Sequence, residues 1–251
     1  MEVKAGDTVG GRYEVVRVMN VGGMGAIFEA RPLVGLVSSR YERLAIKMLL
    51  PRLMADEAAE DFRRRFQLEC QMLQKLNHPG IPKFIEFLED QGRFLLVMEF
   101  IAGRNLEEEL LETLALGSAN FPVVQAMKDA TQVLEILDYL HRRQPIVLHR
   151  DIKPANMIRD QVAGQIRLVD FGLARFVESS LTQTQVGTLG YNSIEQMQGR
   201  ADPRSDLYSL AASLHHLLSG QTPKPLSYPD ITSLRTDVSP EFGRWLHRAL
   251  E

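Results

Sequence analysis

The hydrophobic pattern of the chain changes near Phe100. Before this point, residues 13–19, 25–30, 43–49 and 94–100 are short runs rich in β-branched, aromatic and apolar side chains. Runs of this length and composition predict β-strands. The first part of the chain is therefore expected to be mainly strand.

The third of these runs alternates between large apolar side chains and others. Leu44, Ile46 and Met48 alternate with Ala45 and Lys47. Because successive side chains of a strand point to opposite faces, Ala45 and Lys47 are expected to share the face opposite the large apolar residues.

Elsewhere the spacing of apolar residues is helical. Residues 57–76, 122–142 and 205–218 carry apolar side chains at steps of three and four, which predicts amphipathic helices. The first helix is expected to end at residues 77–80, Asn-His-Pro-Gly. Cys70 lies in its apolar stripe and is interpreted as a small buried hydrophobe rather than a reactive thiol. Strands followed by helices favour an α+β fold.

Composition sets broad limits on location and partners. The 251 residues are 45% hydrophobic and 24% charged, enough to bury a large core in one two-lobed unit or in two modest domains. A formal net charge of −3 gives no electrostatic case for binding nucleic acid. The sequence has no apolar run approaching a membrane span, and its N-terminus lacks the apolar core of a signal peptide. Cys70 is the only cysteine, so a cytoplasmic location is expected.

One stretch carries the residue types that phosphoryl transfer requires. Residues 149–156 read His-Arg-Asp-Ile-Lys-Pro-Ala-Asn, and Asp-Phe-Gly follows at residues 170–172. Moving the terminal phosphoryl group of a nucleoside triphosphate to a hydroxyl needs divalent cations on the phosphates, a carboxylate beside the hydroxyl, and fixed positive charge. The alternative is a loop whose polar side chains only cap turns.

Each of these side chains has an expected role. Asp151 would orient the attacking hydroxyl and accept its proton, and Lys153 would neutralise the moving phosphoryl group. Asn156 and Asp170 offer the hard oxygen ligands that Mg²⁺ prefers. His149 is expected to pack beneath the phenylalanine of Asp-Phe-Gly rather than to titrate in catalysis.

These motifs resemble the eukaryotic-type serine/threonine protein kinase family, which serves as a general template for this chemistry. Lys153 is similar to the serine/threonine branch, and the glycine string at residues 22–25 is most similar to bacterial members. The resemblance covers almost the whole chain. It implies a two-lobed kinase-like fold with a small antiparallel β N-lobe bearing one helix at residues 1–100, a hinge at 99–103, and a larger, mainly helical C-lobe at 104–251.

The resemblance implies ATP as the phosphoryl donor and Mg²⁺ as the metal, which Mn²⁺ could replace. The glycine string lies between two expected strands, where backbone N–H groups could approach phosphates closely, although a plain hairpin would also explain it. Asn20 stands at the first glycine position of the family pattern and tolerates left-handed backbone. The residues expected to bind ATP are Asn20, Val21, Gly22, Gly23, Met24, Gly25, Ile27, Ala45, Lys47, Met98, Glu99 and Ile101.

Two charged residues of the first lobe acquire roles only through the resemblance. Lys47 is similar to the strand lysine that contacts the α and β phosphates, and Glu69 matches its ion-pair partner on the following helix. Met98 would be the gatekeeper beside the adenine, with Glu99 to Ile101 as its backbone partners. Taken alone, an exposed lysine and a solvated glutamate would be the commoner interpretation.

The segment from Asp170 to Glu195 is expected to regulate the enzyme. Thr182 and Thr184 are the expected sites of autophosphorylation, for which two copies of the chain could dimerise. A phosphate there could bind the Arg150 guanidinium and order the loop, whereas a solvated Ser/Thr-rich loop is the alternative. Thr188 resembles the residue that bonds to the catalytic aspartate and lysine.

The sequence also departs from the family pattern. Ser193-Ile194 replaces the Ala-Pro that normally precedes Glu195, and residues 220–239 are proline-rich where relatives carry another helix. The chain stops at Glu251, before the arginine that normally pairs with Glu195, so the domain is expected to be C-terminally truncated, Glu195 to be unpaired, and stability or activity to be reduced. Asp206 matches the acid that binds the catalytic-loop backbone, although an acid at a helix N-terminus could simply respond to the helix dipole.

Three functional classes remain open. An active serine/threonine protein kinase acting on protein substrates has every catalytic position filled. A nucleotide-binding pseudokinase scaffold would be supported by Asn20 and the altered groove motif. A small-molecule kinase, acting for example on an amino sugar or choline, would also use an Asp and Asn pair.

Overall fold

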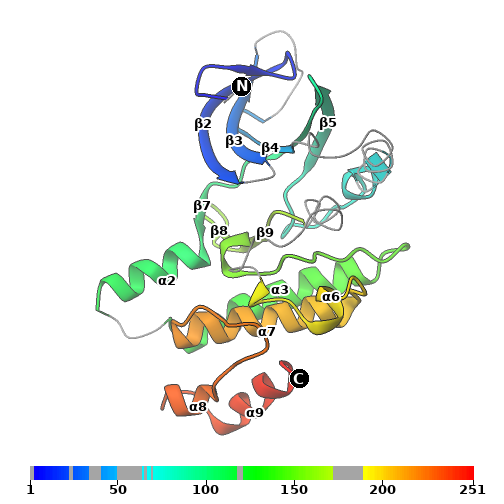
Figure 1. The fold of residues 1–251 in the computed structure, drawn as a ribbon. Helices are drawn as coiled ribbons and strands as arrows, with labels where there is room; N and C mark the ends of the chain where they lie inside the picture. The colour runs from blue at the N-terminus through cyan, green and yellow to red at the C-terminus, as the bar shows by residue number, and fades with distance from the viewer. Residues whose placement is uncertain are drawn as a thin grey trace. The chain divides into compact units, whose positions relative to one another are not determined.

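The computed structural model describes residues 3–22, 25–33, 41–49, 64, 67–68, 70–117, 121–171 and 189–251. The described residues form two compact units (Figure 1). Unit 1 contains those up to Asn77 together with Pro82–Ile101, and unit 2 contains His78–Ile81 and those from Ala102 onward. The described helices include none that is both long and apolar enough to cross a membrane.

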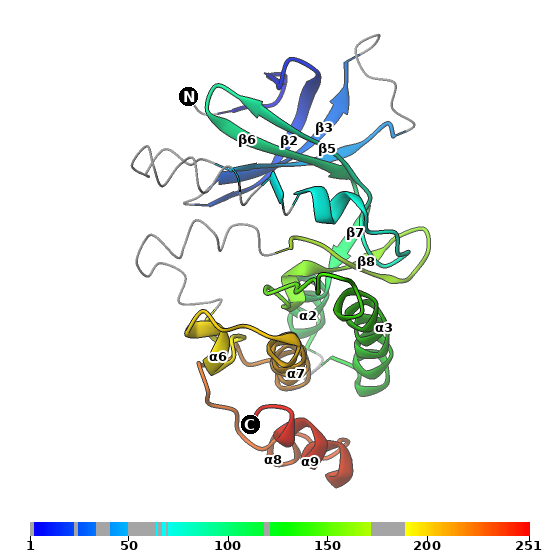
Figure 2. The same cartoon turned by 90° about the vertical axis from the view of Figure 1, so that its right-hand side faces the viewer.

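Unit 1 is built on a six-stranded antiparallel sheet in the order β1-β2-β3-β4-β6-β5. Figure 2 labels β2, β3, β5 and β6 of this sheet. Its strands are β1 (Thr8–Val9), β2 (Tyr13–Gly22), β3 (Gly25–Pro32), β4 (Leu44–Leu49), β5 (Phe84–Asp90) and β6 (Arg93–Glu99). The four predicted strands are confirmed as β2, β3, β4 and β6. Of the predicted helix at 57–76, the described residues 64, 67–68 and 70–74 are helical, and Cys70 is buried.

The alternation in β4 is also confirmed, and it shows how the sheet acquires a buried face. Leu44, Ile46 and Met48 are buried, whereas Ala45 and Lys47 are half-buried. The buried face belongs to an apolar cluster drawn mainly from four strands. Its other members include Val9, Tyr13, Val15, Phe28, Ala30, Leu95 and Val97.

Strand β5 was not predicted from the pattern. Its residues are half-buried except for Glu89, so its sequence lacks a clear alternation. The turn to β6 uses Gln91 and Gly92, both with left-handed backbone at φ 51° and 70°. Left-handed pairs suit two-residue hairpins, but Asn-Gly or Asp-Gly is the usual sequence signal, and Gln-Gly is not.

Unit 2 combines a small sheet with a mainly helical body. The sheet has the order β7 (Gly103–Asn105), β8 (Met157–Asp160) and β9 (Ile166–Leu168). Its helices are α2 (Leu106–Ala115), α3 (Val123–His141), the 3₁₀ turn η1 (Pro154–Asn156), α6 (Ile194–Met197), α7 (Pro203–Ser219), α8 (Ile231–Leu234) and α9 (Pro240–Arg248). Helix α3 packs against α7, which confirms the two long helices expected here and completes the α+β class.

Local sequence determines where α7 begins and ends. Asp202 caps its N-terminus, Pro203 occupies the first helical position, and the Asp202 N–H donates in turn to Ser205 Oγ at 3.2 Å. Gly220 ends the helix with a left-handed φ of 67°. Asp accepts a free N–H of the first turn, Pro has no N–H that needs a partner, and Gly adopts the left-handed conformation that ends a helix. Between Gly220 and Ser239 the only helix is the single turn α8, as the loss of periodicity predicted.

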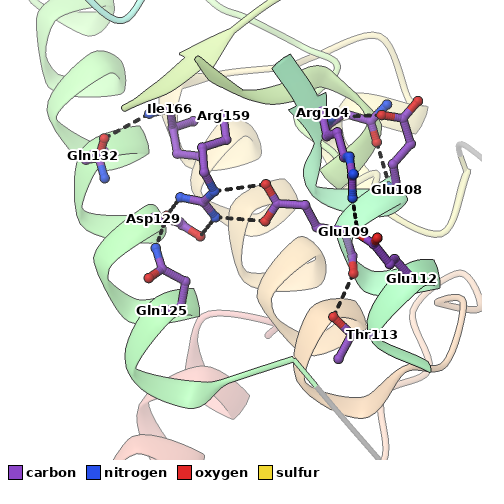
Figure 3. A network of polar contacts seen from close by, with 11 residues as sticks. Arg104, Glu108, Glu109, Glu112, Thr113, Gln125, Asp129, Gln132, Arg159 and Ile166 are labelled. Carbon is purple, nitrogen blue, oxygen red and sulfur yellow. Dashed lines mark hydrogen bonds and ion pairs between the residues drawn. The ribbon is translucent and has the colours of Figure 1, made fainter. Parts of the chain in front are cut away.

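A partly buried ionic network joins three elements of unit 2 (Figure 3). Arg159 on β8 donates to Glu109 of α2 at 2.9 and 3.0 Å and to Asp129 of α3 at 2.9 Å through two nitrogens. Gln125 also donates to Asp129 at 2.9 Å. The Asp129 side chain is only 2% exposed, and its hydrogen bond raises the pKa of Arg159.

We expect Arg159→Met to lower the free energy of unfolding by about 3 kcal/mol, because removing the cation leaves the buried Asp129 carboxylate without its positively charged partner. Urea unfolding followed by circular dichroism measures this change. Arg104→Met is the matched control, since the Arg104–Glu112 pair is more than half exposed and such pairs contribute at most about 1 kcal/mol. Equal losses in the two variants would contradict a structural role for the network.

Candidate functional site

The loop from His149 to Asn156 lies in unit 2 between α3 and β8. Two of its residues, Asn156 and Lys153, contact the Asp151 carboxylate. Asn156 Nδ2 donates to the Asp151 backbone oxygen at 2.7 Å and to its Oδ2 at 2.8 Å. Lys153 Nζ lies 3.0 Å from the same Oδ2. The turn η1 brings Asn156 back toward Asp151. Two residues predicted from the sequence therefore contact the carboxylate of a third.

Asp170 follows a segment that contacts this loop. The Val169 N–H donates to the Asn156 carbonyl oxygen at 2.9 Å, immediately before Asp170. Asp170 has left-handed backbone with a φ of 61°. A non-glycine residue pays conformational energy for this geometry, and such residues concentrate at functional sites.

His149 links the loop to the same segment. The Asp151 N–H donates to His149 Nδ1 at 3.3 Å, so Nε2 carries the proton and donates to the Val169 oxygen at 3.1 Å. The imidazole ring packs on Phe171 with ring centroids 4.6 Å apart. Burial lowers the pKa of His149, which favours the neutral ring. The expectation that His149 packs against this phenylalanine is confirmed.

Asp206, in the first turn of α7, binds the backbone of the loop. Its carboxylate accepts the His149 N–H at 3.0 Å, the Arg150 N–H at 2.8 Å and a contact from His141 Nε2 at 2.9 Å. Asp206 is 1% exposed, and Arg150 adopts left-handed backbone with a φ of 65°. The predicted tie between this acid and the loop is confirmed.

The prediction that Glu195 lacks a partner is wrong. Ser205 Oγ donates to Glu195 Oε1 at 2.8 Å. Burial by itself would raise the pKa of Glu195, but hydrogen bonds from Ser193 and Ser205 outweigh it and the net pKa is lowered. The sequence argument considered only an arginine as partner, whereas two serine hydroxyls satisfy the carboxylate.

The proline-rich loop after α7 contacts the segment at residues 190–191. The Tyr228 hydroxyl donates to the Gly190 carbonyl oxygen, and a Cβ added at Gly190 would lie 2.1 Å from the Pro223 carbonyl oxygen. The Tyr191 hydroxyl lies 2.7 Å from His216 Nδ1 on α7. This loop therefore makes direct contacts with the chain before α6.

In unit 1, strand register gathers several of the residues expected to bind ATP. Ile27 is paired with Lys47, and Ala45 is paired with Met98. Side chains of directly paired residues lie on the same face of an antiparallel sheet. These four residues therefore share one face, opposite the buried cluster, and all are half-buried. Asn20 pairs with Ile27 on the neighbouring strand.

Glu99, at the end of β6, is hydrogen-bonded to the backbone of Lys83. The Glu99 N–H donates to the Lys83 carbonyl oxygen at 2.8 Å, and Glu99 Oε2 accepts the Lys83 N–H at 3.0 Å. The N–H and the side chain of Glu99 thus both bind the backbone of Lys83. Ile101 is 6% exposed.

Several predicted site residues lie outside the described residues, so the structure says nothing about them. They are Gly23, Met24, Glu69, Thr182, Thr184 and Thr188.

The donor chemistry at Asn156 and Asp170 fits Mg²⁺. Both protons of Asn156 Nδ2 point to Asp151 oxygens, so Oδ1 is the side-chain atom that a cation could use. Mg²⁺ in such sites usually takes one or two protein oxygens and completes its shell with phosphates and waters. In the described part of the chain, no cluster of three or more His, Cys, Asp or Glu residues could hold a metal by itself.

Sequence reasoning missed Gln196, which is buried on α6. Its Nε2 donates to the Arg150 carbonyl oxygen at 3.0 Å and to Asn192 Oδ1 at 2.9 Å. No periodicity or motif singled it out. The available signal was its position two residues after the departure at Ser193-Ile194.

The chain is similar to the members of one protein family. A family model described as "Protein kinase domain" matches residues 13–237. Among curated relatives, "Serine/threonine-protein kinase B" of Synechocystis sp. is 31% identical over 96% of the chain and 43% of the relative. "Serine/threonine-protein kinase PknJ" of Mycobacterium tuberculosis is 36% identical over 88% of the chain and 36% of the relative. The chain thus spans less than half the length of these relatives.

Solved structures agree on the fold. The kinase domain of Mycobacterium tuberculosis PknI matches with a TM-score of 0.76 and 29% identity, covering 100% of this chain and 92% of that one. The structure described as "PpkA-294 apo form" matches with a TM-score of 0.73 at 22% identity. The arrangement of strands and helices is therefore that of a known α+β architecture.

Acid should destabilise the chain partly through His216. Burial, followed by the neighbouring His215, lowers the pKa of His216 from 6.5 to about 4. Below pH 6.5 the unfolded chain binds a proton that the folded chain rejects, so stability falls as the pH falls toward 4. This group alone should remove about 2 kcal/mol between pH 7 and pH 5.

Urea unfolding at pH 7 and pH 5 measures this effect. We expect His216→Gln to reduce the pH dependence by that amount, leaving a residual slope from other buried groups. The matched control is His247→Gln, at a histidine whose side chain is 66% exposed. A slope that His216→Gln does not alter would refute the assignment.

Proposed function

The chain belongs to the protein kinase domain family, and from this premise we propose that it transfers the γ-phosphoryl group of ATP to serine or threonine hydroxyls of proteins. The named serine/threonine kinases among its relatives support this activity. The observation that carries the proposal is the loop in which Asn156 and Lys153 together fix the carboxylate of Asp151.

Asp151 acts on the protein substrate. Its carboxylate accepts the proton of the attacking hydroxyl while the hydroxyl oxygen forms a bond to the γ-phosphorus and the bond to the ADP oxygen breaks. Lys153, 3.0 Å from Asp151 Oδ2, supplies positive charge beside the transferring group. The hydrogen bonds from Asn156 hold the carboxylate in one orientation, which reduces the entropy lost on reaching the transition state.

Asn156 Oδ1 and the Asp170 carboxylate would hold Mg²⁺, with Mn²⁺ as a substitute. The ion would neutralise charge on the β and γ phosphates. Two protein oxygens suffice for such a site because the nucleotide and water supply the others. The left-handed backbone of Asp170 and the Val169 to Asn156 hydrogen bond support this use.

The half-buried sheet face of unit 1 would bind the nucleotide. Ile27, Ala45 and Met98 offer an apolar surface suited to an adenine ring. Lys47 on the same face would contact the α and β phosphates, with Glu69 as its partner by analogy with the family. The backbone of Glu99 to Ile101 would contact the adenine, with the Glu99 N–H already donating to the Lys83 carbonyl oxygen.

We also propose how the chain is regulated, how far its domain extends and where it is located. Thr182 and Thr184 would be phosphorylated by a second copy of the chain, and Thr188 would contact the catalytic aspartate. The whole of residues 1–251 would form the kinase domain, with lobes divided near residues 99–103. Its single cysteine, which is buried, is in keeping with a cytoplasmic enzyme.

We expect Asp151→Asn to lower phosphoryl transfer by about 10³-fold, because an amide cannot accept the hydroxyl proton. Transfer of radiolabelled phosphate from Mg-ATP to a generic basic protein measures the rate. The matched control is Asp138→Asn, at a carboxylate on α3 that is 60% exposed. Binding of Mg-ADP, measured by calorimetry, should be retained in both variants.

The same assay separates the alternatives. A wild-type chain that binds nucleotide but transfers no phosphate would support a pseudokinase scaffold. Transfer to an amino sugar or choline, but not to protein, would support a small-molecule kinase. Either result would overturn the proposed function.

Incubation of the wild-type chain with Mg-ATP should place phosphate on Thr182 or Thr184. Mass spectrometry of the digested protein detects it, and Asp151→Asn should remain unmodified when incubated alone. An unmodified segment in a chain that phosphorylates protein substrates would refute autophosphorylation at these residues.

A further inference from the structure

The peptide group between Arg150 and Asp151 is held from both sides. Its carbonyl oxygen accepts a hydrogen bond from Gln196 Nε2 at 3.0 Å, and its N–H donates to His149 Nδ1 at 3.3 Å. The preceding N–H, that of Arg150, donates to Asp206 Oδ1 at 2.8 Å. A rotation of this peptide would break the contacts to Gln196 and His149 together.

The peptide needs such support because the backbone before it is unfavourable. Arg150 has a φ of 65°, a left-handed conformation that costs energy for any side chain with a Cβ. Such a conformation persists only where surrounding contacts enforce it. The orientation of this peptide determines the direction in which Asp151 leaves the backbone.

The contact requires a primary amide at residue 196. Gln196 Nε2 uses its two protons for the Arg150 carbonyl oxygen and for Asn192 Oδ1, the latter at 2.9 Å. The opposite orientation of the amide would direct Oε1 against two acceptor oxygens. A carboxylate would be repelled by the same oxygens, and an aliphatic side chain would leave them without this donor.

Gln196 is an unfavourable choice for a buried position if packing alone were required. It is 8% exposed, and its Oε1 has no hydrogen-bond partner among the residues that the structure describes. A buried acceptor without a partner opposes folding. The use of both amide protons gives a reason for a glutamine at this position.

We propose that Gln196 is a positioning residue for Asp151, an inference that rests on the proposed function in which Asp151 is the base. It fixes the Arg150–Asp151 peptide and so aims the carboxylate. It also makes the aim of Asp151 depend on α6, the turn that follows the segment at residues 189–193. A displacement of α6 would therefore be transmitted to the base through a single side chain.

The test compares Gln196→Met and Gln196→Glu with Gln198→Met, which alters an exposed glutamine at the end of the same turn. We expect Gln196→Met to lower kcat by about 10- to 100-fold, because small misplacements of a catalytic group have effects of this size. The KM for ATP and the Kd for Mg-ADP should change less than twofold. Gln196→Glu should have the lowest kcat, and Gln198→Met should match the wild-type chain.

Hydrogen exchange at the Asp151 amide gives a readout that does not depend on activity. Loss of the Gln196 contact should accelerate this exchange in Gln196→Met but not in Gln198→Met. If the wild-type chain transfers no phosphate, the proposed function fails while the exchange rates still decide whether Gln196 holds the peptide. Kinetics and exchange thus distinguish the two failures.

Two results would overturn the inference. One is a folded Gln196→Met variant with wild-type kcat and wild-type exchange at Asp151. The other is a parallel loss of kcat, nucleotide affinity and thermal stability, which would indicate that Gln196 only supports folding. A selective loss of kcat with faster exchange supports it.

Discussion

The geometry of unit 2 depends on the hydrogen bonds that the buried carboxylate of Asp206 accepts. It accepts backbone N–H groups from His149 and Arg150 and a ring nitrogen contact from His141. Buried N–H groups in a loop have no ladder or helix to satisfy them, so a side chain must do so. Because Asp206 lies in the first turn of α7, the positive end of the helix dipole also stabilises its charge.

The first turn of α7 anchors two segments at once. Asp206 holds the loop that carries Asp151, and Ser205 holds Glu195 of α6. Gln196 then joins α6 to the loop through the Arg150 carbonyl oxygen. The loop, α6 and α7 thus form a closed ring of hydrogen bonds in which each member is held by the other two.

Periodicity predicted the elements whose residues alternate or repeat clearly. The buried and half-buried residues of β4 follow its sequence alternation, and α3 and α7 follow their apolar spacing. Strand β5 was not predicted because both of its faces are half-buried and its turn carries Gln91 in place of a typical turn residue. Without a clear alternation or a continuous apolar run, hydrophobic patterning gives no signal for such a strand.

The loop at residues 149–156 could be singled out because phosphoryl transfer demands particular residue types at fixed spacing. Gln196 and Ser205 could not be predicted, since neither belongs to a motif and their partners, the Arg150 carbonyl oxygen and the Glu195 carboxylate, are not adjacent to them in the sequence. The partner of Glu195 was predicted wrongly because a distant arginine was considered and a nearby hydroxyl was not. Such contacts depend on tertiary geometry that the linear sequence does not encode locally.

The close approach between Gly190 and the proline-rich loop has an evolutionary consequence. No side chain larger than hydrogen fits at residue 190 while the Pro223 carbonyl oxygen stands 2.1 Å from the Cβ position. A descendant of this chain could acquire a side chain there only after its loop had been remodelled. Residue 190 and the loop from Pro223 to Tyr228 would therefore diversify together, as one inherited block.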